Sequence, residues 1–273
     1  HLQALFQRTM GAPHAFEHRR AELGPVDDDA VVRSFLEDVA PDGVVSAYLA
    51  RSRMTHRIGD TLFVHGGIPE AAWLHLPDGT RCPDLDTWTG ELERWLVAQL
   101  GLFAEDPTGA LADPPAWWPL IAYQMPQLPS RAHAASIIYG RTVFDGNNPA
   151  LPAIDVRRDL LAADLPHLVV GHTPNGDMPS FVRDEAGFTL VVADTSYPRS
   201  AVCPVLWHDG YGLRARGRAA LDDGRDLAAK TDLRHDPRVG RWVGGWLDKG
   251  ELESGERLMF RFTGGTTFEQ IAD

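Results

Sequence analysis

Apolar residues near the start of the chain recur at the three- and four-residue intervals of one helix face. They are Val31, Val32, Phe35, Leu36 and Val39. The acidic run just before them, residues 27–29, is typical of a first helical turn, where carboxylates cap free amide groups. The pattern predicts a helix from Asp27 to Val39 and a second, short helix over Val44–Leu49.

Three short apolar runs further along the chain are typical of buried strands, and each leads into a polar residue. The residues that they reach are His65, His172 and Asp194. In layered α/β sheets ligands usually bind at the carboxyl ends of the strands, which share one edge of the sheet. We therefore expect these three side chains to meet at one sheet edge.

The region from about residue 69 to 135 differs in kind, because it holds five of the eight tryptophans and many prolines. One amphipathic helix is predicted within it, over Thr87–Leu100. We interpret the region as a helical, tryptophan-rich lid inserted into a core that spans residues 1–203. Short extended pieces between Asp/Gly turns then predict a C-terminal antiparallel β module over residues 204–273. The expected fold class is α/β (α+β).

Composition narrows the possible partners and location. The net charge of −12 argues against binding to nucleic acid or anionic membranes, which requires a basic face. No apolar stretch approaches the roughly 20 residues of a membrane-spanning helix. The two cysteines, Cys82 and Cys203, have no metal-ligand spacing and are typical of a reducing compartment, so a soluble, cytoplasmic protein is expected. The first residue is His1, without an initiator Met or a targeting segment, and we expect a fragment or processed product.

His65 and His172 are the candidate metal ligands. Each follows an apolar strand and stands next to a glycine, which holds the ring on a rigid element and leaves room for a ligand near the backbone. Histidine is the commonest metal ligand in proteins. Taken singly, each would more often be a hydrogen-bonded core histidine, but two such strand ends together favour a metal site.

The sequence around these histidines resembles a known family. Leu62-Phe-Val-His-Gly-Gly-Ile68 and Val169-Val-Gly-His-Thr-Pro174 are similar to the fourth and fifth blocks of calcineurin-like metallophosphoesterases, in particular the phosphoprotein-phosphatase-like and bacterial Shewanella-like branches. Between them, Ile137-Ile-Tyr-Gly-Arg141 resembles the aromatic-x-Arg segment of that branch. Ala193-Asp-Thr-Ser196 resembles the turn after the fifth block, so four blocks occur in order.

The resemblance implies a β-sandwich flanked by helices that holds two divalent ions, Mn, Fe or Zn. Such a pair clamps a phosphate group and activates water for in-line attack, and His65 and His172 would ligate the second metal. The implied function is hydrolysis of a phosphoester, with a phosphorylated small molecule or a phosphoprotein as substrate. A dinucleoside polyphosphate hydrolase is the alternative within the family.

Further residues receive roles from their positions in the blocks. Arg141 would bind the non-bridging phosphate oxygens through its planar donor fork, unless it only forms a surface ion pair. Gly66 and Thr173 would contact the substrate. Asp194 would orient His172 as a hydrogen-bond acceptor, although strand-end aspartates are more often turn formers. His167 and His133 are additional candidates to face the site.

Three upstream blocks of the family are absent from this chain. They are the Asp-x-His, Gly-Asp-x-x-Asp and Gly-Asn blocks, which supply the first metal's ligands and the bridging carboxylate. We therefore expect the carboxy-terminal portion of a metallophosphoesterase, inactive alone, whose parent protein is a phosphatase. Two other readings stay open: a truncated binding or regulatory module, and an unrelated α/β protein with coincidental His-Gly and Gly-His turns.

Overall fold

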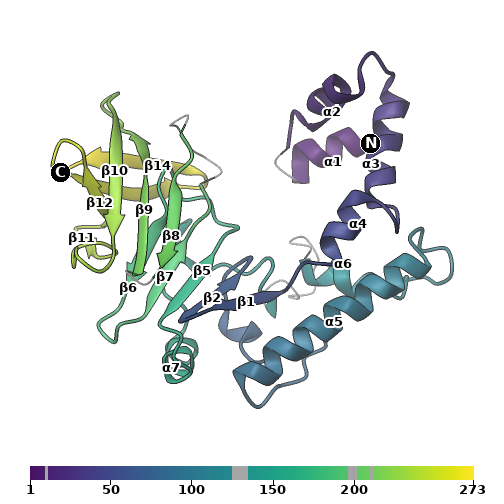
Figure 1. Ribbon diagram of the computed structural model, residues 1–273, viewed down its shortest axis with the longest axis horizontal. Helices are drawn as coiled ribbons and strands as arrows, with labels where there is room; N and C mark the ends of the chain where they lie inside the picture. The colour runs from purple at the N-terminus through teal and green to yellow at the C-terminus, as the bar shows by residue number, and fades with distance from the viewer. Residues whose placement is uncertain (10–11, 125–134, 196–198, 200–201, 210–211) are drawn as a thin grey trace. The chain divides into compact units, whose positions relative to one another are not determined.

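A computed structural model describes residues 1–9, 12–124, 135–195, 199, 202–209 and 212–273 of the chain. These residues divide into two compact units (Figure 1). The first unit comprises His1–Ser52 and Leu96–Trp118, and the second comprises Arg53–Trp95 and Pro119–Asp273. Helix α5, Leu85–Glu105, begins in the second unit and ends in the first, and it contains the predicted helix over Thr87–Leu100.

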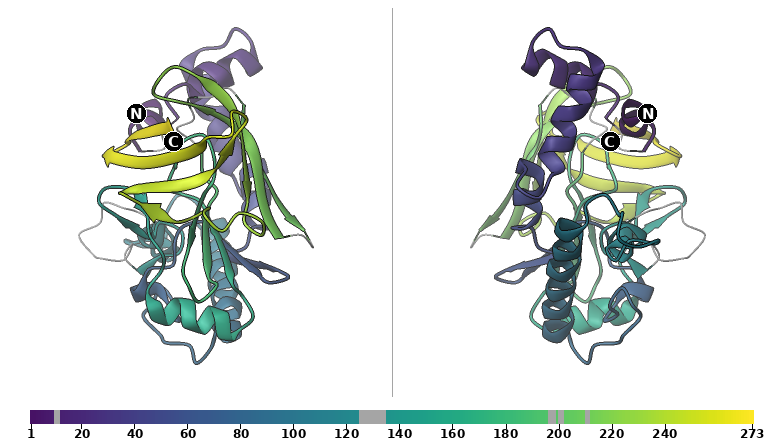
Figure 2. Two further views of the ribbon diagram at one scale, coloured as in Figure 1. Left: turned by 90° about the vertical axis from the view of Figure 1, so that its left-hand side faces the viewer. Right: turned by 90° about the vertical axis from the view of Figure 1, so that its right-hand side faces the viewer.

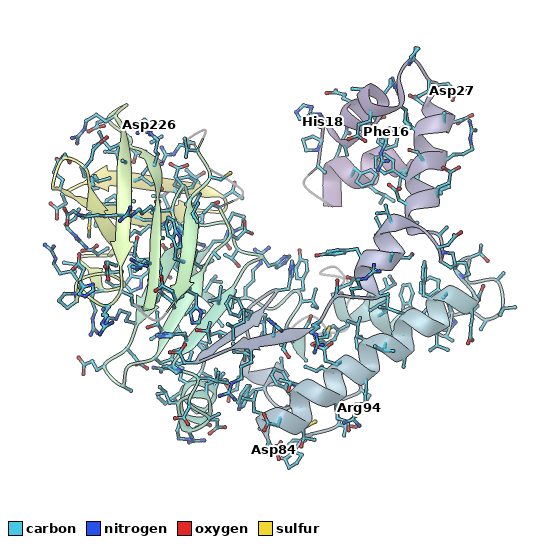
Figure 3. The ribbon with its side chains drawn as sticks, in the orientation of Figure 1. Phe16, His18, Asp27, Asp84, Arg94 and Asp226 are labelled. Atoms are coloured by element: carbon cyan, nitrogen blue, oxygen red, sulfur yellow. The ribbon has the colours of Figure 1, made fainter. Side chains whose placement is uncertain are left out.

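The first unit is helical, as the apolar pattern predicts. Its helices are α1 (Leu2–Thr9), α2 (Ala15–Leu23), α3 (Asp28–Val39) and α4 (Val44–Leu49). The Asp27 carboxylate accepts a hydrogen bond from the backbone amide of Ala30 at 2.8 Å, which confirms its capping role at the start of α3 (Figure 3). The rings of Phe6, Phe16 and Phe35 pack together at centroid distances of 4.8–6.0 Å.

The second unit contains a mixed five-stranded sheet in the order β1-β2-β5-β7-β6. Its three central strands, β2, β5 and β7, run parallel, while the outer strands β1 and β6 pair antiparallel to their neighbours. The carboxyl ends of the three predicted strands therefore share one edge. The strands are β1 (Thr55–Ile58), β2 (Thr61–Val64), β5 (His167–Val170), β6 (Ser180–Arg183) and β7 (Thr189–Val192).

The C-terminal sheet is antiparallel, in the order β14-β13-β12-β10-β9-β8, with β11 paired to β12. Figure 2 shows β13 and β14 turned strongly relative to β9 and β10, so the sheet is markedly twisted. Its strands are β8 (Val205–Asp209), β9 (Gly212–Ala220), β10 (Asp226–Asp232), β11 (Trp242–Val243), β12 (Trp246–Leu252), β13 (Arg257–Gly264) and β14 (Thr267–Ala272). The sequence pattern did not predict β6 or β10.

One buried cluster joins the two sheets. Val169, Phe181 and Val191 of the mixed sheet pack in it with residues of the C-terminal sheet such as Leu213 and Leu258. Apolar burial of this kind is the main favourable term that holds two layers together. The fold is thus mixed α/β: a mixed five-stranded sheet with helices, followed by a separate antiparallel sheet.

Short elements complete the second unit. They are η1 (Glu70–Ala72), α6 (Trp118–Gln124), the hairpin β3 (Val143–Phe144) and β4 (Asn148–Pro149), and α7 (Ile154–Ala162). Helix α7 buries Val156 and Leu160. Of the predicted lid, residues 125–134 lie outside the described part of the chain, and the division at residue 203 stays a prediction. None of the described helices combines the length and the apolar character needed to cross a bilayer.

Candidate functional site

The ends of β2 and β5 bring His65 and His172 together. The Gly171 amide donates to the His65 carbonyl at 2.9 Å, so the pairing of the two strands extends one step beyond them. His172 then adopts a left-handed backbone with φ of 59°, which turns the chain sharply. The imidazole centroids lie 5.4 Å apart, with 45° between the ring planes. The two rings are neighbours at one edge, as the sequence predicts.

Close packing against the segment 137–141 explains why glycines follow His65 at positions 66 and 67. The Gly66 amide donates to the Ile137 carbonyl at 2.8 Å, and the Gly67 amide donates to the Gly140 carbonyl at 2.7 Å. A β-carbon on Gly66 would lie 2.7 Å from the carbonyl oxygens of Ile138 and Gly140, closer than real contacts allow. Only glycine fits, and the Gly66 amide is already used within the protein.

This packing places the aromatic-x-Arg segment beside the histidines. The Tyr139 ring meets the His172 ring edge to face at a centroid distance of 4.3 Å. The Arg141 guanidinium lies 5.7 Å from the centre of the Tyr139 ring, and Arg141 is exposed. Within the described residues Arg141 has no ion-pair partner, so the alternative role as a surface ion pair finds no support.

Tyr123 of α6 anchors the same segment, a role that was not predicted for it from the sequence. Its buried hydroxyl accepts a hydrogen bond from the Ile137 amide at 3.0 Å. Burial raises the pKa of this phenol to about 12, although the hydrogen bonds to Ile137 and Ser136 oppose the shift. The Ser136 hydroxyl accepts further bonds from the amides of Ile138 and Tyr139. The contact joins Tyr123 to a separate segment at Ile137, and local sequence patterns do not indicate such contacts.

The electrostatic environment keeps His172 neutral. Burial of the ring is the main cause that lowers its pKa to about 4, and the positive charge of Arg141 and the proximity of His65 add to the effect, against Asp194. The buried Nε2 atom of His172 has no hydrogen-bond partner in the part of the chain that the structure describes. A neutral imidazole with an unused ring nitrogen is the form that binds metal.

Thr173 and Asp194 lie at the same edge. Thr173 is 5% exposed, and its carbonyl accepts a bond from the Asn175 side chain at 2.8 Å. The Asp194 carbonyl accepts from the Asn175 amide at 2.9 Å, while the negative charge of Asp194 raises the pKa of His172. Both predicted residues are therefore close to His172 in the fold. Ser196, at the end of the fourth block, lies outside the described residues.

The donors at this edge fit part of a metal site. Two imidazoles, one of them with an unpartnered buried nitrogen, suit a divalent ion such as Zn, Mn or Fe. A catalytic zinc usually has three protein ligands, and the described residues contain no group of three or more His, Cys, Asp or Glu that could hold an ion. The edge thus brings two imidazoles together, and the described residues add no further group that would complete a two-metal cluster.

No family model, curated protein or solved structure matches this chain significantly. The case for a function therefore rests on the four sequence blocks and on the geometry of the edge to which they contribute.

His167 is not part of this edge, contrary to its candidate role. It is the first residue of β5 and so lies at the amino edge of the sheet. There its Nε2 is 3.8 Å from an Asp60 oxygen, and the His208 Nε2 is 3.1 Å from the other oxygen of Asp60 and 2.9 Å from the Thr61 hydroxyl. His208 and His167 thus form a second pair of histidines beside Asp60, which was not predicted. His133, the other candidate, lies outside the described residues.

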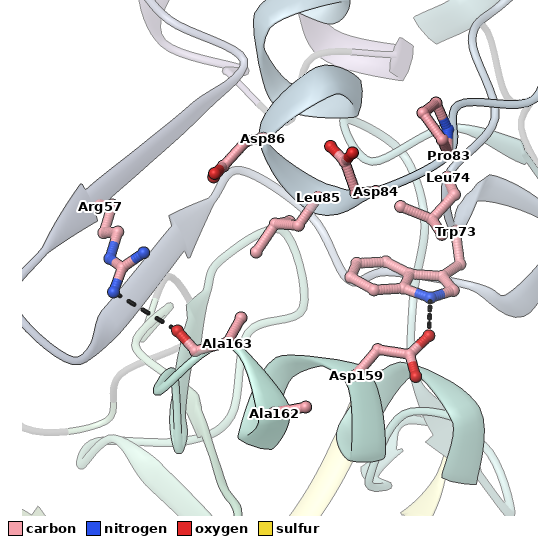
Figure 4. A pocket seen from close by; sticks show the side chains of 10 residues that line it. All are labelled: Arg57, Trp73, Leu74, Pro83, Asp84, Leu85, Asp86, Asp159, Ala162 and Ala163. Atoms are coloured by element: carbon pink, nitrogen blue, oxygen red, sulfur yellow. Dashed lines mark hydrogen bonds between the residues drawn. The ribbon is translucent and has the colours of Figure 1, made fainter.

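A concave surface lies away from this edge. A cavity of about 510 Å³ is lined by residues of β1, the start of α5 and α7, among them Arg57, Asp86 and Asp159 (Figure 4). The Trp73 indole lies in it and donates to the Asp159 carboxylate at 3.1 Å. None of the predicted site residues lines this cavity, so we assign it no part in the candidate site.

Proposed function

We propose that this chain supplies the second-metal ligands and the phosphate-binding arginine of a two-metal phosphoester hydrolase. His65 and His172 would hold one divalent ion, and the remaining ligands would come from sequence outside this chain. The finer fold assignment, a metallophosphoesterase β-sandwich, belongs to the same proposal. A phosphorylated small molecule or a phosphoprotein is the substrate class that the resemblance implies.

The observation that carries the proposal is the state of His172. Its Nε2 atom is buried and has no hydrogen-bond partner among the described residues, although burying an unsatisfied polar atom is unfavourable. The ring is neutral at pH 7 and lies beside a second imidazole. A bound cation would satisfy this atom, and the neighbouring positive charge of Arg141 would then attract an anionic substrate to the same edge.

Each side chain around His65 and His172 would have a separate role. The chemistry that a bound pair of divalent ions supplies is polarisation of the phosphoester and activation of water. Arg141 would bind the phosphate oxygens, because its guanidinium is exposed and has no carboxylate partner among the described residues. Tyr139 packs edge-on against His172 and fixes the orientation of its ring. Asp194 would favour the metal-bound state through its negative charge.

Metal binding tests the proposal directly. We would titrate the chain with Co²⁺ at pH 7.5 and follow the imidazole signals by NMR. His65→Ala and His172→Ala are each expected to weaken binding by about 10-fold or more, on the order of the losses caused even by indirect ligand support. His235→Ala is the control, because His235 is exposed and paired with Asp232. Equal affinity in all four proteins would rule out the site.

Hydrolysis gives a second, independent test. With added Mn²⁺, this chain is expected to hydrolyse an aryl phosphate no faster than its His65→Ala variant, because two imidazoles without a bridging carboxylate do not hold a catalytic ion pair. The measurement is the initial rate at saturating Mn²⁺. Robust metal-dependent turnover that disappears in the variant would show that this chain contains the remaining ligands after all.

A further inference from the structure

Lys249 of β12 is fully buried, with 0% of its surface exposed. Its Nζ donates a hydrogen bond to the carbonyl of Asn175, in the loop that follows His172, and lies 4.2 Å from the centre of the Phe260 ring. Burial lowers the pKa of this ammonium to about 7, with the charge of Asp177 opposing the shift. A buried ammonium is unfavourable unless it is paired, and a methionine of similar volume would fill the space. What lysine adds is the directed bond to the loop.

The C-terminal sheet holds the next residues of this loop as well. The side-chain amide of Gln270 donates to the Asp177 carboxylate at 2.6 Å and its oxygen accepts from the Asp177 amide at 3.1 Å. The Ala220 amide also donates to Asp177, at 2.9 Å. Gly176 has φ of 72°, and a β-carbon there would lie 2.5 Å from the Gln270 oxygen. The loop is therefore fitted closely onto the C-terminal sheet.

Asn175 connects this anchored loop to the candidate site. Its amide donates to the Asp194 carbonyl at 2.9 Å, and its side chain donates to the Thr173 carbonyl at 2.8 Å. The Ser180 hydroxyl in turn donates to the Asn175 side-chain oxygen at 3.0 Å. Every polar group of Asn175 is thus bonded, and the residue is fully buried. A shift of Asn175 would therefore move Thr173, which follows His172, and Asp194, which follows β7.

We propose that Lys249 is a positioning residue for the candidate site. Through its bond to Asn175 it fixes the turn of His172 and Thr173, and with it the neighbouring end of β7 at Asp194. The left-handed backbone of His172 is unfavourable for a non-glycine residue and needs surrounding contacts to hold it. The C-terminal sheet is then part of the site's framework. That the turn binds metal rests on the proposed function, whereas the positioning itself does not.

The test compares two core variants of the full chain. Lys249→Met removes the ammonium and keeps the volume. Thr231→Val is the matched control, because the buried Thr231 hydroxyl donates to the Lys249 carbonyl at 2.6 Å without touching the loop. At pH 7.5 we would record the imidazole NMR signals, the Co²⁺ dissociation constant and the melting temperature.

We expect Lys249→Met to shift the His172 ring signals and to weaken Co²⁺ binding by about 10-fold, the scale of a lost supporting contact. Thr231→Val should lower the melting temperature but leave both readouts unchanged. If the two variants behave alike, the positioning role is wrong. If the unaltered chain binds no Co²⁺ at the histidines, the proposed function fails, yet the His172 signals still decide the role of Lys249.

A measurement on the unaltered chain covers the case in which Lys249→Met does not fold. As pH rises through about 7, the Lys249 ε-methylene signals report the loss of its proton. A His172 signal that changes with the Lys249 midpoint, both in the unaltered chain and in His65→Ala, supports the coupling; the variant removes the neighbouring imidazole, whose charge also acts on His172. A His172 signal that is flat through the lysine titration overturns it.

Discussion

The two edges of the five-stranded sheet each carry a pair of histidines, but the charged neighbour with the largest effect has the opposite sign at each edge. At the carboxyl edge, His65 and His172 lie beside Arg141, and the charge of the arginine lowers the pKa of His172. At the amino edge, His167 and His208 lie beside Asp60, whose charge raises the pKa of His167. Burial is the main cause that lowers the pKa of both His167 and His172. Each ring also feels a weaker charge of the other sign, because Arg183 lowers the pKa of His167 and Asp194 raises the pKa of His172.

Under the proposed function, these charges indicate which edge would receive an anionic substrate. At the amino edge the Asp60 carboxylate lies 3.1 Å from the His208 Nε2, and its negative charge disfavours a bound phosphate. At the carboxyl edge Arg141 has no carboxylate partner among the described residues, and the His172 Nε2 has no hydrogen-bond partner there. Under the proposed function, the arginine would attract a phosphate and the ring nitrogen would bind a cation. Residue type alone does not separate the two pairs, since strand β5 begins at one histidine and leads into the other.

The largest expected effect comes from glycines at the two edges. Gly66→Ala places a β-carbon 2.7 Å from two carbonyl oxygens at the carboxyl edge, so we expect the free energy of unfolding to fall by about 3 kcal/mol. Gly59→Ala, at the amino-edge turn with φ of 58°, meets only a His208 ring carbon at 3.8 Å and should cost about 1 kcal/mol. Urea unfolding measures both. Equal losses would mean that the segment of Tyr139 does not pack tightly on the His65 loop.

Acid sensitivity should also differ between the edges. In the folded protein the pKa of His172 is about 4, below its unfolded value of about 6.5, so the unfolded state binds more protons in this window. The stability linked to His172 is therefore complete above about pH 6.5 and is lost as pH falls towards 4. His172→Asn should flatten the dependence of unfolding free energy on pH, as measured by urea unfolding at a series of pH values.

The same series with His167→Asn should show a smaller flattening. Burial lowers the pKa of His167, but the charge of Asp60 opposes this effect. An equal or larger flattening in His167→Asn would contradict the contrast between an edge with an arginine and an edge with a carboxylate.

The smallest effects come from the charged neighbours, and they should have opposite signs. Arg141→Met removes a positive charge and should raise the pKa of His172, whereas Asp60→Asn removes a negative charge and should lower the pKa of His167. NMR titration of the ring protons would resolve shifts of a few tenths of a pKa unit, the scale of a partly screened charge. Shifts in the same direction would mean that the charges do not act as the distances imply.

Several elements could be predicted because their signal is local. The helical period before Val39 and the apolar runs of β2, β5 and β7 each lie within a dozen residues. Strand β6, Ser180–Arg183, has only two apolar residues, and its place depends on pairing with β7. Strand β10, Asp226–Asp232, begins and ends in aspartate, so its membership of the sheet comes from the strands on either side.

The parts of the site that depend on local sequence could be predicted, and the parts that depend on long-range contacts could not. The strand ends placed His65 and His172 at one edge, because parallel strands finish together. His167 was misplaced for a reason that the sequence contains: a residue before a strand lies at the opposite edge from a residue after it. The bond from Lys249 to Asn175 joins residues 74 positions apart, and no pattern along the chain specifies which buried carbonyl an ammonium will reach.

The left-handed backbone conformation of His172 lowers the stability of the fold at the position where we propose that a metal binds. Glycine would adopt a φ of 59° without penalty, while a residue with a β-carbon is disfavoured there by about 1 kcal/mol. The polypeptide therefore holds the ring that we propose as a metal ligand in a conformation that a stability-optimised sequence would avoid. If the proposed function is right, a substitution that relieves this backbone angle, such as glycine for His172, would gain stability and remove the proposed metal ligand.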